Sequence, residues 1–189
     1  VVDLSNGTDS TDSSNNTVVI AAGDDVAQLS TAHTSMDTIE FTTSTFGTTY
    51  VNNFDGNDRL DFSAYLADTE SDSGSELSKE WIDHTVGNND TLEANELTVV
   101  KFSSNADVVD FDALNANNIL SFRDFKADFN QDVVGGVAHS VVMVENDDNE
   151  GEYKVFYVEF DSDDADFELS SSNFTEQGIV DFGASLGAL

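Results

Sequence analysis

Residues 49–66, TYVNNFDGNDRLDFSAYL, decide the expected fold because they place an acidic turn between two strand-like segments. The turn at residues 55–58 concentrates carboxylate and side-chain amide oxygens, and Gly56 there permits a positive φ. Leu60 and Phe62 supply the apolar side of the segment that follows. Oxygen ligands of this kind suit a hard cation, calcium above all. The stretch therefore predicts a calcium site between two strands, with a solvated hairpin turn as the alternative.

Segments of the same type recur along the chain, rich in Val, Ile, Thr and Phe and separated by Gly, Asn and Asp. They fall at residues 17–22, 26–30, 36–41, 98–102, 106–111 and 178–182. The clearest hairpin is expected at residues 140–160, around the acidic turn 146–151. Short helices are expected at residues 75–82, capped by Ser75, and within residues 112–129. The fold class is therefore mainly β, a β-sandwich or an irregular β-roll with one or two short helices.

The composition divides the chain into an arm and a domain. Residues 1–16 are mostly Ser, Asn, Asp and Thr, which predicts a flexible arm or linker, although Val1, Val2 and Leu4 offer a strand to a neighbouring subunit. Residues 17–189 are expected to form a single β-rich domain with an exposed acidic loop at 67–80. Because Val1 is not an initiator Met, the chain is expected to be a processed product or part of a longer one.

The charge balance excludes several classes of partner. Six Lys and Arg stand against 38 Asp and Glu, for a net charge of −32. Two carboxylates about 5 Å apart repel by roughly 3 kcal/mol at an effective dielectric near 20, so folding needs spaced charges, high salt or bound cations. Nucleic acid is almost excluded as a partner, and anionic membranes are disfavoured, because the chain has no basic surface to neutralise their phosphates. The chain has no Cys, which removes disulfides and thiolate metal sites, and no apolar run approaches the ~20 residues of a membrane span.

A short pattern recurs: Asp, any residue, an aliphatic residue, an acid, then Phe. It stands at residues 37–41, 58–62 and 107–111, with a weaker copy at 90–94 and its ending at 178–182. The spacing of this whole set is irregular, which predicts against tight solenoid repeats. Simple alternation in an acidic β-protein is the other explanation.

Two of these regions resemble a known family. Residues 55–60 (DGNDRL) resemble a degenerate copy of the glycine- and aspartate-rich nonapeptide of RTX proteins, which bind calcium in parallel β-rolls, and residues 87–92 (GNNDTL) are a poorer copy. Residues 54–66 and 178–186 are similar to C-terminal regions of bacterial type I-secreted surface-layer proteins and adhesins. The resemblance implies passage through a type I secretion machinery without a cleaved N-terminal signal. It also implies folding on meeting extracellular calcium, and a location outside the cell or on its surface.

The candidate calcium ligands form four acidic clusters. They are Asp24 and Asp25; Asp55, Asn57, Asp58 and Asp61; Asp147 and Asp148; and Asp161, Asp163, Asp164 and Asp166. Calcium takes six to eight oxygens, so each cluster supplies part of a shell that backbone carbonyls and water complete. Two EF-hand-like stretches fail: Thr85 and Gly87 occupy chelating positions in one, and His139 replaces the bidentate Glu in the other.

The sequence contains no motif for catalysis or for haem binding. The chain has no nucleophile elbow, phosphate-binding loop or dinucleotide fingerprint, and with so many acids carboxylate pairs arise by chance. The histidines lack metal-ligand spacing, and nothing singles out His33 or Tyr65 as a haem ligand. A non-enzymatic role is therefore expected.

These expectations converge on an extracellular calcium-binding structural protein. It would be a subunit of a bacterial surface layer, filament or matrix, self-associating through edge strands and cation bridges. The alternative is a C-terminal type I secretion and folding module of a larger adhesin or secreted enzyme.

Overall fold

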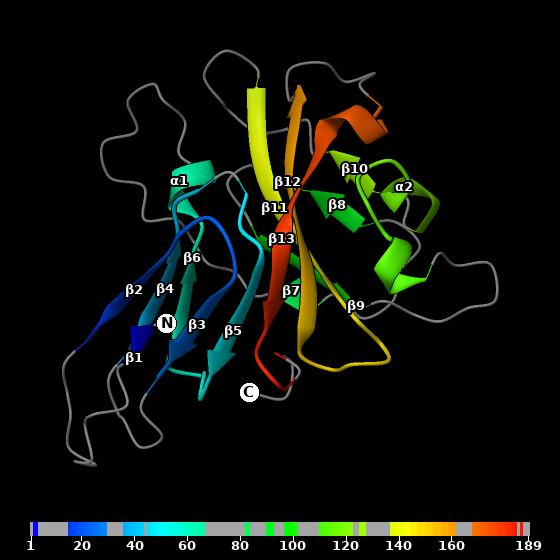
Figure 1. The fold of residues 1–189 in the computed structure, drawn as a ribbon. Helices are drawn as coiled ribbons and strands as arrows, with labels where there is room; N and C mark the ends of the chain where they lie inside the picture. Colours follow the sequence, from blue (N-terminus) through cyan, green and yellow to red (C-terminus); the bar gives the residue numbers. More distant parts are fainter. Residues whose placement is uncertain are drawn as a thin grey trace.

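The computed structural model describes the residues in the ranges 2–3, 15–29, 36–43, 45–66, 82–83, 90–92, 97–101, 110–122, 125–127, 137–161, 168–184 and residue 186. Within them the fold is mainly β, which confirms the predicted class (Figure 1). None of the described helices is long and apolar enough to cross a membrane.

The N-terminal part of the chain, up to residue 61, winds back and forth between two sheets. Its strands are β1 (Val2–Asp3), β2 (Thr17–Ile20), β3 (Asp25–Gln28), β4 (Thr38–Phe41), β5 (Thr48–Asn52) and β6 (Arg59–Asp61). The even-numbered strands form a three-stranded parallel sheet in the order β2-β4-β6, and the odd-numbered strands pair in parallel at one end of an eight-stranded sheet. Each pass through both sheets makes one coil, so the strands β1 to β6 form a short solenoid, which we call the coil stack.

The coil stack corrects the prediction against solenoid repeats. The copies of the acidic pattern at residues 37–41 and 58–62 lie side by side in register, with Thr38 paired to Arg59. Thr17 pairs with Thr38 in the same way, so Asn16, Asp37 and Asp58 stand at equivalent points of successive coils, 21 residues apart. Of the copy at residues 107–111 only Asp110 and Phe111 are described, and its irregular distance in sequence from the other copies obscured this period.

Alternating apolar side chains explain why these segments stack. Val18, Ile39 and Leu60 occupy the same register position in β2, β4 and β6 and are almost wholly buried. Two residues further along these strands, Phe41 stacks on Phe62 with ring centroids 4.6 Å apart. The Phe41 ring also contacts Phe46, at a centroid distance of 4.8 Å. No coil can bury this surface alone, so stacking supplies the hydrophobic core.

The C-terminal half is built on the predicted hairpin, which is confirmed. Strands β11 (Val137–Glu145) and β12 (Glu152–Asp161) pair antiparallel around the turn at residues 146–151. Strand β13 (Phe174–Asp181) pairs antiparallel with β12 and parallel with β5, and thereby joins the hairpin to the coil stack. Strands β9 (Leu97–Lys101) and β7 (Ile82–Asp83) complete the far edge of the eight-stranded sheet.

Small elements cover the ends and one face of the hairpin sheet. They are α1 (Ser63–Leu66), η1 (Phe111–Ala113), α2 (Ile119–Phe122), η3 (Ser171–Asn173), and the two-stranded pair β8 (Asp90–Leu92) and β10 (Phe125–Ala127). Figure 1 shows the coil stack in blue and cyan on one side of the hairpin, with β8, β10 and α2 in green on the other. The hairpin is accordingly buried on both faces: Val141 and Met143 join the core of the coil stack, and Val142 and Val144 join a second core with Phe111.

Several local predictions need correction. The acidic turn at residues 55–58 is not a hairpin turn, because β5 and β6 belong to different sheets. Ile82, placed in a helix, lies in β7, and the rest of that predicted helix and the acidic loop 67–80 lie outside the described residues.

The remaining departures lie in the segment 112–129 and at the chain's start. The short helices expected there are present as η1 and α2, but Phe125 lies in β10 because it pairs with Asp90. Of the strand expected at 106–111, residues 106–109 lie outside the described residues and Phe111 begins η1. Within the expected arm, Val2–Asp3 form β1 against β3.

Candidate functional site

The turn at residues 55–58 forms a corner of the coil stack, and Asp58 is its most constrained acid. Its side chain is only 4% exposed. Its Oδ1 accepts the backbone N–H of Asp37 at 3.0 Å, and its Oδ2 accepts the backbone N–H of Asp55 at 2.9 Å. The Asp58 N–H in turn donates to the Asp55 carbonyl at 3.0 Å. The corner is therefore closed by a buried carboxylate held by two backbone donors.

The same arrangement repeats one coil earlier. Asp37, 1% exposed, accepts at Oδ1 both the backbone N–H and the side-chain Nδ2 of Asn16, each at 3.0 Å. Backbone bonds run in parallel, from Thr38 to the Asn16 carbonyl and from Arg59 to the Asp37 carbonyl, both 2.8 Å. The result is a polar ladder of Asn16, Asp37 and Asp58 across three coils. Of these three residues, Asp58 alone was predicted from the sequence as a ligand; the common spacing of 21 residues was the signal for the other two.

The exposed part of the corner has a different backbone from the one predicted. The Asn57 N–H donates to Asp55 Oδ1 at 2.7 Å, a local Asx turn. Gly56 does not adopt a positive φ; the left-handed residue is Asn53, at φ 63°, whose Nδ2 donates to the Leu29 carbonyl at 2.8 Å. Asparagine tolerates this conformation better than most residues do. The turn thus depends on Asn53 and Asp58 rather than on glycine.

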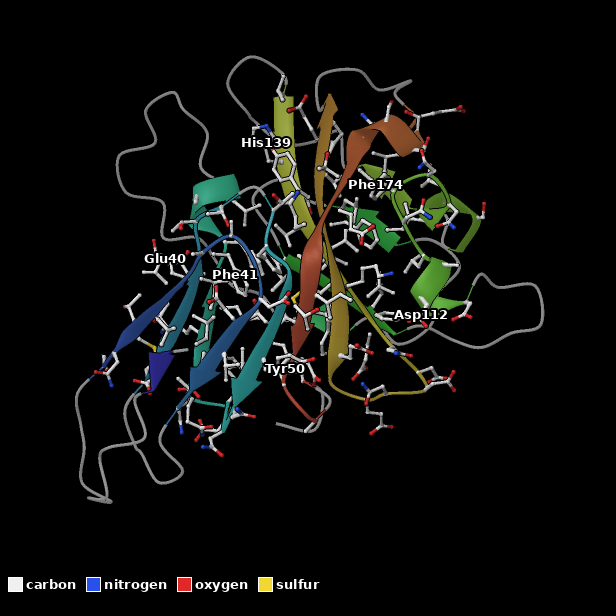
Figure 2. All side chains as sticks on the ribbon, in the orientation of Figure 1. Glu40, Phe41, Tyr50, Asp112, His139 and Phe174 are labelled. Carbon is white, nitrogen blue, oxygen red and sulfur yellow. The ribbon has the colours of Figure 1, made fainter. Side chains whose placement is uncertain are left out.

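A second acidic pair lies on the outer face of the three-stranded sheet. Glu40 of β4 is directly opposite Asp61 of β6, and both are half-buried. Figure 2 shows Glu40 on the outer side of the coil stack, whereas Phe41 points into its interior. Register partners on adjacent parallel strands point to the same face of a sheet, so both carboxylates lie on the outer face of this one. Asp61 was a predicted ligand and Glu40 was not.

Asp24 and Asp25 lie at the next corner, between β2 and β3. Asp24 Oδ1 accepts the Thr48 N–H at 2.9 Å from the following coil, and Asp25 Oδ2 accepts the Ala21 N–H at 3.1 Å. Each carboxylate therefore bridges a different pair of backbone segments, and the two do not converge on one point.

The hairpin turn places its acids differently. Asp147 and Asp148 are exposed, and the buried acid there is Glu145, 3% exposed, which sequence reasoning missed. It accepts the Tyr153 hydroxyl at 2.8 Å and the Gly151 N–H at 3.3 Å. No sequence signal marks Glu145, because a single acid at the end of an apolar strand is common.

The fourth cluster is largely outside the described chain. Asp161 is the last residue of β12 and pairs with Val137, whereas Asp163, Asp164 and Asp166 lie outside the described residues. Across the ranges that the structure does describe, no three His, Cys, Asp or Glu side chains gather closely enough to hold a metal ion by themselves. A cation at the corners would therefore draw further oxygens from backbone carbonyls, amide side chains and water.

Of the described basic side chains, Arg59 directly follows the corner in β6, whereas Lys154 and His139 lie on the hairpin. Lys154 is buried against the second core, where its Nζ donates to the carbonyls of Phe111 and Leu114 at 2.8 and 2.7 Å. His139 lies 3.7 Å from Glu159 on the hairpin. Burial, with a smaller effect from the charge of Glu159, raises the pKa of Tyr157 to about 12. Apart from Arg59, these groups belong to the hairpin rather than to the acidic ladder.

Comparison with known proteins found no matching family model, no similar curated protein and no similar solved structure.

Proposed function

We propose that this protein is an extracellular calcium-binding structural protein, a subunit of a bacterial surface layer, filament or matrix. The observation that supports the proposal is the repetition of acidic positions from one coil to the next: Asp37 and Asp58 at equivalent points, and Glu40 in register with Asp61. Two carboxylates about 5 Å apart would repel by roughly 3 kcal/mol at an effective dielectric near 20. Divalent cations remove that cost and leave the coils packed.

The corner at residues 55–58 is the strongest candidate for the ion. Asp55 and Asn57 are at its surface, and Asp58 fixes its shape from within. A carboxylate oxygen has two lone pairs, so an oxygen that accepts one N–H retains the capacity to ligate a cation. Carboxylate, amide and backbone oxygens in one tight turn are the mixed set that calcium uses in proteins.

The location outside the cell rests on the resemblance to type I-secreted proteins in residues 54–66 and 178–186. A calcium-dependent fold suits export, because the chain remains unfolded where calcium is scarce and folds where it is abundant. The structural role is supported by β2 and β6, which pair with no further described strand on their outer sides, and by the excess of carboxylates that cations can bridge between neighbours.

One observation favours a second function, a C-terminal folding module of a larger secreted protein. Strand β13 covers the β5 edge of the coil stack, and the antiparallel hairpin then ends the parallel series. Solenoids commonly require such a terminal cap. A cap would bind calcium and remain monomeric, whereas a structural subunit would assemble.

Native mass spectrometry with and without chelator tests the proposal, because it reports bound ions and oligomeric state together. The expected result is at least one calcium per chain and assembly that chelator reverses. The variant Asp55→Asn should lose an ion, whereas the matched variant Asp147→Asn, at the exposed hairpin turn, should retain all ions of the corner. A chain that binds no calcium at millimolar concentration would refute the proposal. Calcium binding without assembly would favour the folding module.

A further inference from the structure

Among the described residues, no strand pairs with the outer edge of β2. In that part of the chain β2 pairs with β4 alone, and it lies at the left margin of the coil stack in Figure 1. The Asn16 carbonyl accepts the Thr38 N–H, so the backbone groups of alternate residues from Asn16 onward point toward β4. The N–H and C=O groups of Thr17 and Val19 therefore point away from it. No strand of the described chain pairs with them.

This edge is also neutral and apolar. Residues 13–23, SSNNTVVIAAG, contain no charged side chain in a protein of net charge −32. Val19 is 51% exposed, the most exposed large apolar side chain of the described residues. Edge strands are commonly protected by charge or proline, and the other edge strands of the two larger sheets contain charged residues: Asp3 in β1, Arg59 and Asp61 in β6, and Asp83 in β7. β2 is the unprotected exception.

We propose that β2 pairs antiparallel with β2 of a second copy of this chain across a two-fold axis. This inference rests on the self-association in the proposed function and names the surface that mediates it. A second copy is the fitting occupant because β2 presents no carboxylate to an equally acidic partner. Any approach through β6, β7 or the corners brings like charges together. A two-fold interface uses the same patch on both copies, as this self-complementary edge requires.

The direction of the backbone groups fixes the register. Only Thr17 and Val19 have N–H and C=O groups pointing outward, so the register with most bonds places Thr17 opposite Val19 of the partner copy and Val18 opposite itself. Thr17 and Val19 of the two copies then exchange both of their backbone bonds. The pairing would join two three-stranded sheets, in the order β2-β4-β6 in each copy, into one continuous sheet. Since the strand is short, the dimer is expected to be concentration-dependent.

The absence of Cys from the chain allows a direct test of the register. Opposite residues of a hydrogen-bonded antiparallel pair have Cα atoms about 5.5 Å apart, within disulfide range, whereas Thr17 to Thr17 or Val19 to Val19 lie two residues out of register, beyond about 7 Å. A mixture of Thr17→Cys and Val19→Cys chains should therefore cross-link several-fold faster than either variant alone. The mixture and each single variant should cross-link faster than Tyr50→Cys, an exposed control on β5. A mixture no faster than the single variants, or than the control, would overturn the pairing.

A backbone variant separates pairing from folding. Val19→Pro removes an N–H that points away from β4, a position where an edge strand tolerates proline. By sedimentation equilibrium with saturating calcium, the wild type should dimerise and Val19→Pro should remain monomeric with an unchanged thermal midpoint. If Val19→Pro unfolds, Thr17→Pro replaces it, because the Thr17 N–H also points away from β4 and Thr17 is the first residue of the strand. A wild type that stays monomeric while calcium still raises its midpoint overturns the β2 pairing and leaves calcium binding intact. Cross-linking in the predicted register without any calcium effect supports the pairing and refutes the calcium proposal.

Discussion

Replacing Asp58 by Ala removes the acceptor that closes the corner of the coil stack. The side chain accepts two backbone N–H groups, from Asp37 at 3.0 Å and from Asp55 at 2.9 Å. Hydrogen bonds to a charged group contribute about 1.5–3 kcal/mol each, and a buried donor left without a partner incurs its full desolvation cost. Asp37 is buried, so water does not replace the lost bond there, whereas the Asp55 N–H is half-buried and loses less. We expect Asp58→Ala to lower the free energy of unfolding by about 3–4 kcal/mol.

Two further variants isolate the cause. Asp58→Asn retains one oxygen for the Asp37 N–H and turns an amide toward the Asp55 N–H, so it loses one bond while also losing a repulsive charge. We expect a cost of about 1–2 kcal/mol. Asp147→Ala, at the exposed hairpin turn, removes the same charge without a buried bond and should stay within about 0.5 kcal/mol of the wild type.

Urea unfolding at fixed calcium, followed by circular dichroism, measures these differences. For an m-value of about 2 kcal/mol/M, the midpoint of Asp58→Ala should fall by roughly 1.5–2 M. An equal effect of Asp58→Ala and Asp147→Ala would refute the reasoning, because the loss would then follow charge rather than buried hydrogen bonds.

Three other variants test the packing and electrostatics of the hairpin. Gly151→Ala would place a Cβ against the Ala184 backbone nitrogen at a φ of 95°, whereas Gly23→Ala has φ 102° but open space around it; urea unfolding should therefore show the larger loss, about 2–4 kcal/mol, for Gly151→Ala. Lys154→Met leaves two buried carbonyls at η1 without their donor and should cost about 2–3 kcal/mol in the same assay. Burial raises the pKa of Tyr157 to about 12, so the unfolded chain releases this proton first and stability should fall as pH rises from about 10 towards 12. Tyr157→Phe should reduce that alkaline loss, measured as the thermal midpoint against pH; an unchanged alkaline slope would contradict this account.

The hairpin and the class of fold could be predicted because their signals are local. Residues 140–160 alternate through a strongly apolar strand, an acidic turn and a second apolar strand, and antiparallel neighbours joined by a short turn pair with one another. The coil stack could not be assembled in the same way, because β5 and β6 look like hairpin partners but belong to different sheets. Parallel pairing joins residues a whole coil apart, and it is encoded by a 21-residue spacing that Asn16, Asp37 and Asp58 share with the apolar residues Val18, Ile39 and Leu60.

The candidate site shows the same limit. Asp55, Asn57 and Asp58 were predicted together and do share one turn. Asp24 and Asp25, adjacent in sequence, bond to separate backbone segments, because neighbouring residues in an extended chain point in opposite directions. Composition shows which segments are rich in acids, but the pairing of strands between coils determines which of these acids become neighbours.

The measurement that tests the account most directly is the thermal unfolding midpoint of the intact chain in dilute buffer, first after exhaustive metal removal and then with millimolar calcium. Calcium at about a hundred times its dissociation constant stabilises the folded form by about 2.7 kcal/mol, which for a chain of this size raises the midpoint by roughly 5–10 °C. The account predicts that rise for calcium and a much smaller one for sodium at equal ionic strength. Equal midpoints in stripped and calcium-loaded protein would contradict it.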